Sequence, residues 1–412
     1  MVAPATYTET LSLSKDLTLL GAGPETTIID AGGANRVLSV IQARVVISGF
    51  TLQNGRTNLL AGGLFNSGTL TLDHVVVRFN QGLEPGGLFN STNGVLLLRN
   101  SLVYSNTAQQ RAGGIWNAGQ MTVLSSTVRG NQALGVGGGV LASRGAVTVE
   151  ASLIEGNTSD LYGGGLFVGD SRLLVSRSVL SGNLAVEGGG IVIDMSRQPA
   201  RFEAASIVHN RAITGSGGLQ VRTSVGVTLV NSTVSSNRAL TGGGLGVQAA
   251  TLVLSNVTVT ANQGQGGGGL RVEENGSVGL HSTVVAGNLD PEAVAPDCAG
   301  QIVSLGYNLF GNASGCGLTP GPGDLLGQDA PLDPLLGPLT LVAGLPVHPP
   351  QLGSPLVDAG DPTDCPPWDQ VGGSRPQDGD RDGSAICDVG AVERPPMWRV
   401  FLPLVRGEEV KG

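Results

Sequence analysis

The chain has 412 residues and a formal net charge of −9; 66 residues are glycine, 13% are charged and 4% are aromatic. The net negative charge argues against binding of nucleic-acid backbones, which needs a basic face. No apolar run reaches the roughly 18 residues of a membrane-spanning helix. The many small and β-branched residues favour short, half-buried strands over amphipathic helices. We therefore expect an all-β protein with no nucleic-acid partner and no membrane span.

Strand-like sequence begins almost at the amino terminus. The first four residues lead into an alternating run at residues 8–20, without the charged and apolar segments of a signal peptide. Because the strand residues start without a visible cap on a stacked core, we favour a protein whose true amino terminus lies upstream of this sequence. We expect an exported protein whose signal peptide is absent from this chain; a cytosolic protein is the alternative.

Two columns of residues then repeat along the chain. One column is an asparagine that closes a short apolar run, at successive spacings of 25 to 27 residues: Asn54, Asn80, Asn106, Asn131, Asn157, Asn183, Asn210, Asn237, Asn262 and Asn288. The other is a glycine run followed by one aliphatic residue, as in Gly137-Gly138-Gly139-Val140 and Gly163-Gly164-Gly165-Leu166. Two columns that keep register over nine coils indicate a solenoid.

The period predicts a right-handed parallel β-helix with about 26 residues per coil. Such a coil holds two or three short strands joined by tight bends. Stacking places equivalent positions about 4.8 Å apart, so each strand pairs with its copy in the next coil. Inward Leu, Val and Ile side chains then form one core, and the asparagines form a hydrogen-bonded ladder. Glycines suit bends with positive φ or close backbone approach.

These columns resemble the repeats of polymorphic outer membrane proteins and other pectate-lyase-like β-helix proteins. In one departure, Leu64 and Leu88 follow their glycines directly, where those repeats usually place Ala first. A later stretch is similar to the terminal region named choice-of-anchor Q: Leu305-Gly-Tyr-Asn-Leu309, Asp333-Pro-Leu-Leu-Gly-Pro-Leu339, residues 353–360, Asp369-Gln370, Arg375-Pro376 and residues 387–393. The resemblance covers residues 10–394. It implies an extracellular or cell-surface bacterial protein and no defined reaction.

The strict period fades after Asp290, where proline becomes frequent. We expect regular coils over residues 1–290, irregular final coils over 291–360, a Cys/Asp-rich cap over 361–394 that closes the open end of the solenoid, and a tail over 395–412. The cysteines divide by position into two pairs, Cys298 with Cys316 and Cys365 with Cys387. Export favours disulfides over reduced thiols in both pairs.

An acidic loop near the carboxyl end is a candidate cation site. Asp378, Asp380 and Asp382, followed by Gly383, match the first half of a calcium loop, and Asp388 could add an oxygen. Val389 stands where such a loop places a bidentate glutamate. We expect either a structural calcium ion or an acidic, glycine-rich turn without an ion.

One outward column is apolar and partly aromatic. The second residue after each glycine run is predicted to face solvent: Phe65, Phe89, Trp116, Leu141, Phe167 and Val192. Phe65, Phe89, Trp116 and Phe167 could stack on sugar rings or contact another surface protein. The alternatives are simple ladder packing or cover by another segment of the chain.

A charged patch contains the candidates for catalysis. Asp194, Arg222 and Glu273 lie in one outward column, near Arg271. β-Helix lyases and glycosidases use carboxylates or an arginine base on such a strand, whereas alternating charges also decorate ordinary sheet faces. We expect a monomeric, non-enzymatic binding, adhesion or structural module, with polysaccharide or another surface protein as partner. A polysaccharide lyase or glycoside hydrolase acting on this face is the alternative.

Overall fold

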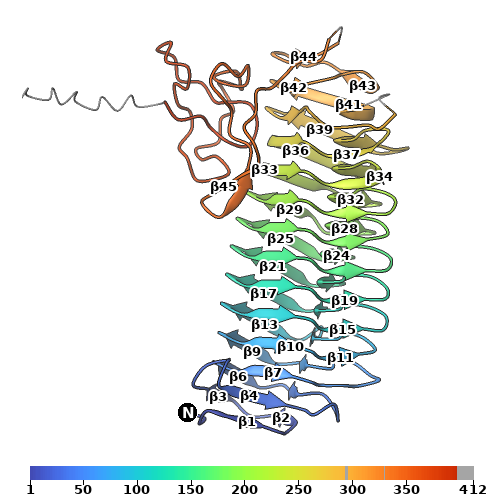
Figure 1. Ribbon diagram of the computed structural model, residues 1–412, viewed down its shortest axis with the longest axis vertical. Helices are drawn as coiled ribbons and strands as arrows, with labels where there is room; N and C mark the ends of the chain where they lie inside the picture. Colours follow the sequence, from blue (N-terminus) through green and yellow to red (C-terminus); the bar gives the residue numbers. More distant parts are fainter. Residues whose placement is uncertain (293–295, 329, 397–412) are drawn as a thin grey trace, which may run out of the picture.

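The computed structural model describes residues 1–292, 296–328 and 330–396, which form strands stacked into a long parallel solenoid (Figure 1). No helix in this described part is long and apolar enough to cross a membrane. The expected tail at 395–412 lies almost wholly outside the described residues. The all-β parallel solenoid predicted from the sequence is confirmed, since equivalent residues in successive coils, such as Val140 and Leu166, pair at a spacing of about 26.

Three columns of strands run the length of the solenoid, each strand paired in parallel with its copy in the next coil. The first column contains β2 (Leu11–Leu13), β5 (Leu38–Val40), β8 (Leu64–Asn66), β12 (Leu88–Asn90), β16 (Ile115–Asn117), β20 (Val140–Ala142), β24 (Leu166–Val168), β28 (Ile191–Asp194), β32 (Leu219–Arg222), β35 (Leu245–Gln248), β38 (Leu270–Val272) and the start of β41 (Cys298–Gly306). These twelve strands count the coils.

The second column follows the first after a short bend. It contains β3 (Leu17–Leu20), β6 (Arg44–Ser48), β9 (Thr69–Asp73), β13 (Val95–Arg99), β17 (Gln120–Leu124), β21 (Ala146–Glu150), β25 (Arg172–Ser176), β29 (Ala200–Glu203), the first parts of β33 (Val227–Ser235) and β36 (Thr251–Thr260), β39 (Ser277–His281), the end of β41, and β43 (Cys316–Thr319). Inward side chains of these strands, such as Leu96 and Leu98, are buried in one continuous apolar core.

The third column and a short fourth one complete each coil. The third contains β1 (Ala5–Tyr7), β4 (Thr27–Asp30), β7 (Thr51–Gln53), β10 (Val76–Arg78), β14 (Leu102–Tyr104), β18 (Thr127–Arg129), β22 (Leu153–Glu155), β26 (Val179–Ser181), β30 (Ser206–Val208), the ends of β33 and β36, β40 (Val284–Val285), β42 (Leu309–Phe310) and β44 (Leu325–Leu326). The fourth contains β11 (Gln81–Gly82), β15 (Thr107–Ala108), β19 (Gln132–Ala133), β23 (Thr158–Ser159), β27 (Leu184–Ala185), β31 (Arg211–Ala212), β34 (Arg238–Thr241) and β37 (Gln263–Gln265).

A buried asparagine ladder joins the third and fourth columns. From Asn80 to Asn288, each side-chain Nδ2 donates to the Oδ1 of the next ladder residue at 2.9–3.0 Å, and the final acceptor is Asp297. The first predicted member is wrong. Asn54 occupies a bend position with φ of 55°, and Gly55 holds the ladder position, donating its N–H to Oδ1 of Asn80.

The glycine column lies directly against this ladder. A Cβ on Gly139 would stand 2.6 Å from the carbonyl oxygen of Gly165 and 2.9 Å from Nδ2 of Asn157. Any side chain there would push apart the coils or the ladder. The two sequence columns are therefore complementary parts of one corner of the coil.

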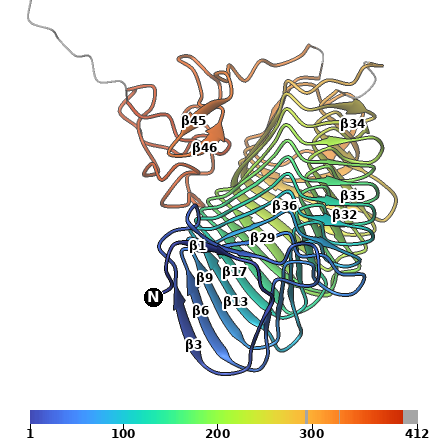
Figure 2. The ribbon, with the colours of Figure 1, turned by 60° about the horizontal axis from the view of Figure 1, so that its bottom comes forward.

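The residues after the solenoid form a side domain, defined here as residues 333–396 (Figures 1 and 2). Its only paired strands among the described residues are β45 (Thr340–Val342) and β46 (Leu345–Val347), an antiparallel hairpin that packs on β30. Gln370 reaches the solenoid, where its Nε2 donates to Oγ of Ser206 at 2.9 Å and its Oε1 accepts from Oγ1 of Thr233 at 2.6 Å. The segment expected to cap the end of the solenoid thus covers its side.

Both predicted disulfides are present. Cys298 is bonded to Cys316 within the last coils, and Cys365 is bonded to Cys387 within the side domain. The solenoid itself continues to β44, so residues 291–360 comprise both final coils and the first part of the side domain.

Ladder asparagines should matter far more than exposed ones. Asn157→Ala removes its side-chain bonds to the Val128 carbonyl and to Asn183, and deprives Asn131 of its acceptor. We expect a loss of about 1–3 kcal/mol in the free energy of unfolding, because buried groups lose partners. Asn93→Ala, at an exposed turn, should change it by less than about 0.5 kcal/mol. Equal effects in urea denaturation would contradict the ladder assignment.

The ladder terminus should give a pH-dependent stability. Asp297 is buried, and burial raises its pKa even though it accepts N–H bonds from Asn288 and Asn312. An acid whose folded pKa is raised contributes stability at low pH that is lost as the pH rises from about 4 through the raised value. The free energy of unfolding of wild type minus that of Asp297→Asn should therefore fall as the pH rises. A pH-independent difference in chemical denaturation would contradict this expectation.

Candidate functional site

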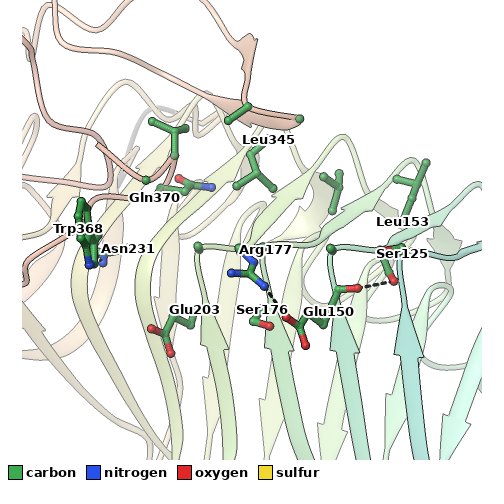
Figure 3. A pocket seen from close by; sticks show the side chains of 18 of the residues that line it. Ser125, Glu150, Leu153, Ser176, Arg177, Glu203, Asn231, Leu345, Trp368 and Gln370 are labelled. Atoms are coloured by element: carbon green, nitrogen blue, oxygen red, sulfur yellow. Dashed lines mark hydrogen bonds and ion pairs between the residues drawn. The ribbon is translucent and has the colours of Figure 1, made fainter. Parts of the chain in front are cut away.

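A groove of about 900 Å³ lies between the side domain and the solenoid (Figure 3). Its floor is the bend between the second and third columns, formed on successive coils by Ser125, Ala151, Arg177 and Ala204. Each of these residues has φ between 45° and 51°, which turns the chain sharply. The bend forms a trough along the solenoid, and the side domain provides a roof over it.

The walls of the groove are chemically mixed. Leu153 and Val179 project from the third column, and Glu150, Ser176 and Glu203 stand at the ends of second-column strands. Glu150 pairs with Ser176 and Ser176 with Glu203 in the parallel register, so the two carboxylates are two coils apart. The groove therefore offers aliphatic surface on one side and polar groups on the other.

Trp368 stands at the mouth of the groove and is 59% exposed. Its turn is held by Asp369, whose Oδ1 accepts the N–H groups of Val371 and Gly373. Its backbone carbonyl accepts a hydrogen bond from Nδ2 of Asn231 on the solenoid at 2.9 Å. An indole held in solvent by a fixed backbone is a ready surface for a ligand.

Charges in the groove are arranged in ion pairs. The guanidinium of Arg177 contacts the carboxylate of Glu150. The carboxylate of Glu203 accepts from Nε of Arg201 at 3.2 Å. These side chains are between about one-third and two-thirds exposed, so solvent screens them and each pair contributes little to stability. The carboxylate oxygens of Glu150 and Glu203 remain available to hydroxyl donors.

The expected aromatic stripe exists as a packed ladder. Phe65, Phe89 and Trp116 stack with ring centroids 5.8 and 5.0 Å apart and tilted planes. The guanidiniums of Arg36 and Arg111 lie over the Phe65 and Trp116 rings, at 5.2 and 5.8 Å from the centroids. The prediction that Leu141 and Val192 of the same column face solvent is wrong, since both are buried, and Phe167 is half-buried. Such rings are less open to a flat ligand than Trp368, and their binding role stays a prediction.

The catalytic candidates fall into two separate clusters of charges. Arg222 contacts Asp194 of the preceding coil at 3.0 Å and Glu187 at 2.8 Å, and its guanidinium lies 4.5 Å from the Tyr162 ring centroid. Glu273 instead pairs with Arg271 at 3.0 Å. The coil of β35 lies between β32 and β38, so Glu273 does not join Arg222. This is the alternating charge pattern expected of a decorated sheet face.

Only part of the predicted calcium set converges. Asp358, Asp378 and Asp380 each place a carboxylate oxygen within 4.8 Å of the others. Asp358, which the sequence motif did not include, joins from another turn of the side domain, and its pKa is raised by burial and by Asp380. Oδ1 of Asp378 is buried without a hydrogen-bond partner. A cation bound by the three carboxylates would supply the partner that this oxygen lacks.

Asp382 and Asp388 lie outside this group. Asp382 caps its own turn by accepting the N–H of Ser384 at 2.7 Å. Asp388 is fully buried and accepts the N–H groups of Asp358 and Arg394. Burial, together with Glu393, raises the pKa of Asp388 to about 7. Its carboxyl group therefore belongs to the interior network of the side domain.

Comparison with known proteins assigns no family. No family model matches the chain, and no curated protein is significantly similar to it. The fold and the groove described above therefore carry the functional argument.

Calcium should stabilise the side domain if the three converging carboxylates bind it. Adding calcium should raise the melting temperature of the wild type, because the ion binds the folded state and offsets the mutual repulsion of the carboxylates. Asp378→Asn should abolish this shift, and Asp382→Asn should retain it. Identical melting temperatures of the wild type in calcium and in chelator would show that this acidic turn binds no calcium ion.

Proposed function

We propose that the protein is an extracellular or cell-surface carbohydrate-binding module whose ligand lies in the groove beside the solenoid. The observation that carries the proposal is Trp368, which is exposed on a hydrogen-bonded turn at the mouth of a groove lined by carboxylates, hydroxyls and aliphatic side chains. Sugars present both C–H faces for an indole and hydroxyl groups for carboxylates.

The disulfides support a location outside the cytoplasm. Two disulfides, Cys298–Cys316 and Cys365–Cys387, account for all four cysteines of the chain. Such bonds persist in oxidising compartments and are rare in the cytosol. The likeness of the repeats to polymorphic outer membrane proteins and of residues 305–393 to a choice-of-anchor Q region supports attachment to a bacterial surface. A binding or adhesive role suits a long, rigid solenoid at that place.

Binding should depend on Trp368 and not on Trp116. We expect the purified protein to be retarded in native gels that contain its polysaccharide, and Trp368→Ala to weaken that retardation about tenfold in apparent affinity. Trp116→Ala should bind like the wild type, because its ring is tilted and covered by Arg111. Circular dichroism melts establish that both variants are folded. Loss of binding in Trp116→Ala alone would move the site to the aromatic stripe.

The alternative function is a polysaccharide lyase or glycoside hydrolase. Incubation with a polysaccharide panel should release neither reducing ends nor unsaturated products if the protein only binds. Turnover that disappears in Asp194→Asn or Arg222→Ala would establish catalysis on the sheet face. Turnover that disappears in Glu150→Gln or Glu203→Gln would establish it in the groove.

A further inference from the structure

The trough that forms the groove continues beyond it toward the amino terminus. The same bend recurs with positive φ at His74 (52°) and Asn100 (49°), on the coils before Ser125, and the residues themselves are exposed. On the later coils the bend is covered, because Asn231 donates to the Trp368 carbonyl and the Ser282 carbonyl accepts the N–H of Gly390. A ligand in the groove can therefore extend in one direction only, along the earlier coils.

The side chains that form the wall of the trough also differ between the earlier coils and the later coils that the side domain covers. On the coils before Ala204 its outward residues are half-buried and mostly apolar: Val76, Leu102, Thr127, Leu153 and Val179. Val179, the last of them, packs against the side domain. On the covered coils the equivalent residues are Ser206, Thr233 and Thr258, which are buried and hydrogen-bonded to the side domain. The open trough presents one such side chain per coil, about every 4.8 Å. A repeating polymer would meet a repeating surface there.

The charges of the trough argue against an acidic polymer. Three arginines in or beside the trough are paired with carboxylates: Arg177 with Glu150, Arg201 with Glu203 at 3.2 Å, and Arg99 with Asp73 at 2.9 Å. Uronate or sulfate groups would need a guanidinium or ammonium free to bind them. They would also approach the carboxylates already in place, which repel like charge.

We propose that the trough binds a neutral, linear polysaccharide that lies parallel to the solenoid axis. One end stacks on Trp368, and the chain runs toward Asn100 and His74 over the aliphatic wall. The carboxylates of Glu150 and Glu203 accept hydrogen bonds from sugar hydroxyls. This assignment of ligand class and direction rests on the proposed function.

The test compares neutral and acidic polymers on the full chain. Isothermal titration with soluble glucomannan, xylan and mixed-linkage glucan should show binding of at least one, and polygalacturonate and alginate should show none. For the neutral ligand, Trp368→Ala should lower the affinity about tenfold. Leu102→Asp should lower it only for oligosaccharides long enough to pass the groove, whereas Leu134→Asp, at an exposed site in the loop after β19, should change nothing. Thermal melts establish that each variant is folded.

A charge variant tests the ligand class directly. Glu150→Gln releases Arg177 from its ion pair and should create measurable affinity for polygalacturonate. Wild-type binding to acidic polymers that is lost in Trp368→Ala would overturn the neutral class while the groove remains the site. Affinity that does not depend on oligosaccharide length or on Leu102 would overturn the axial direction. Absence of binding to every polysaccharide, or binding unaffected by Trp368→Ala, would overturn the proposed function itself.

Discussion

The fold depends on a contact between an amide ladder and a column of residues without side chains. Inside one corner of each coil from Asn80 to Asn288, an asparagine takes part in the ladder, and a glycine backbone lies against its Nδ2, as Gly139 does beside Asn157. Neither column works without the other, because a Cβ at Gly139 would occupy the space of Asn157. The aliphatic core holds the coil closed, but this corner fixes the alignment of one coil on the next.

A ladder of this kind must also end. At the carboxyl side of the stack, Asp297 replaces the next asparagine and accepts the N–H and Nδ2 groups of Asn288. Asp324 does the same for Asn308, whose own Oδ1 accepts the N–H of Thr283 beside the bend between the second and third columns. A carboxylate accepts hydrogen bonds and donates none, so it satisfies the last donors without requiring a further coil. The final strands can then leave the regular repeat.

The repeat could be predicted from sequence because its physical cause recurs at each coil. The error at Asn54 has the same origin: asparagine also tolerates the positive φ of the neighbouring bend position, where Phe79 stands one coil later. The side domain could not be placed, because its partners Ser206 and Thr233 are small hydroxyl residues that look like any others in a strand. They lie more than 130 residues before Gln370, and no local pattern joins them.

The groove escaped prediction for a related reason. Its floor is a backbone bend occupied by unrelated residues, Ser125, Ala151 and Arg177, since positive φ and not residue type defines it. Trp368 is a single aromatic residue in a turn, without a periodic neighbour to mark its role. The outward aromatic column could be recognised in the sequence, and ladder packing was one of the alternatives for it. Only the tilts of its rings and the arginines that cover them show how the column packs.

The position of the side domain has a consequence for how the molecule can grow. Its hydrogen bonds to the solenoid come from the coils between Ala205 and Ser282, while the earlier coils contribute none of these bonds. Duplication or loss of a whole coil among residues 64–176 would leave that attachment intact and move only the amino-terminal end. Gene rearrangements in units of one coil would thus change the reach of the rod, and the length of its open trough, without redesigning its attachment region.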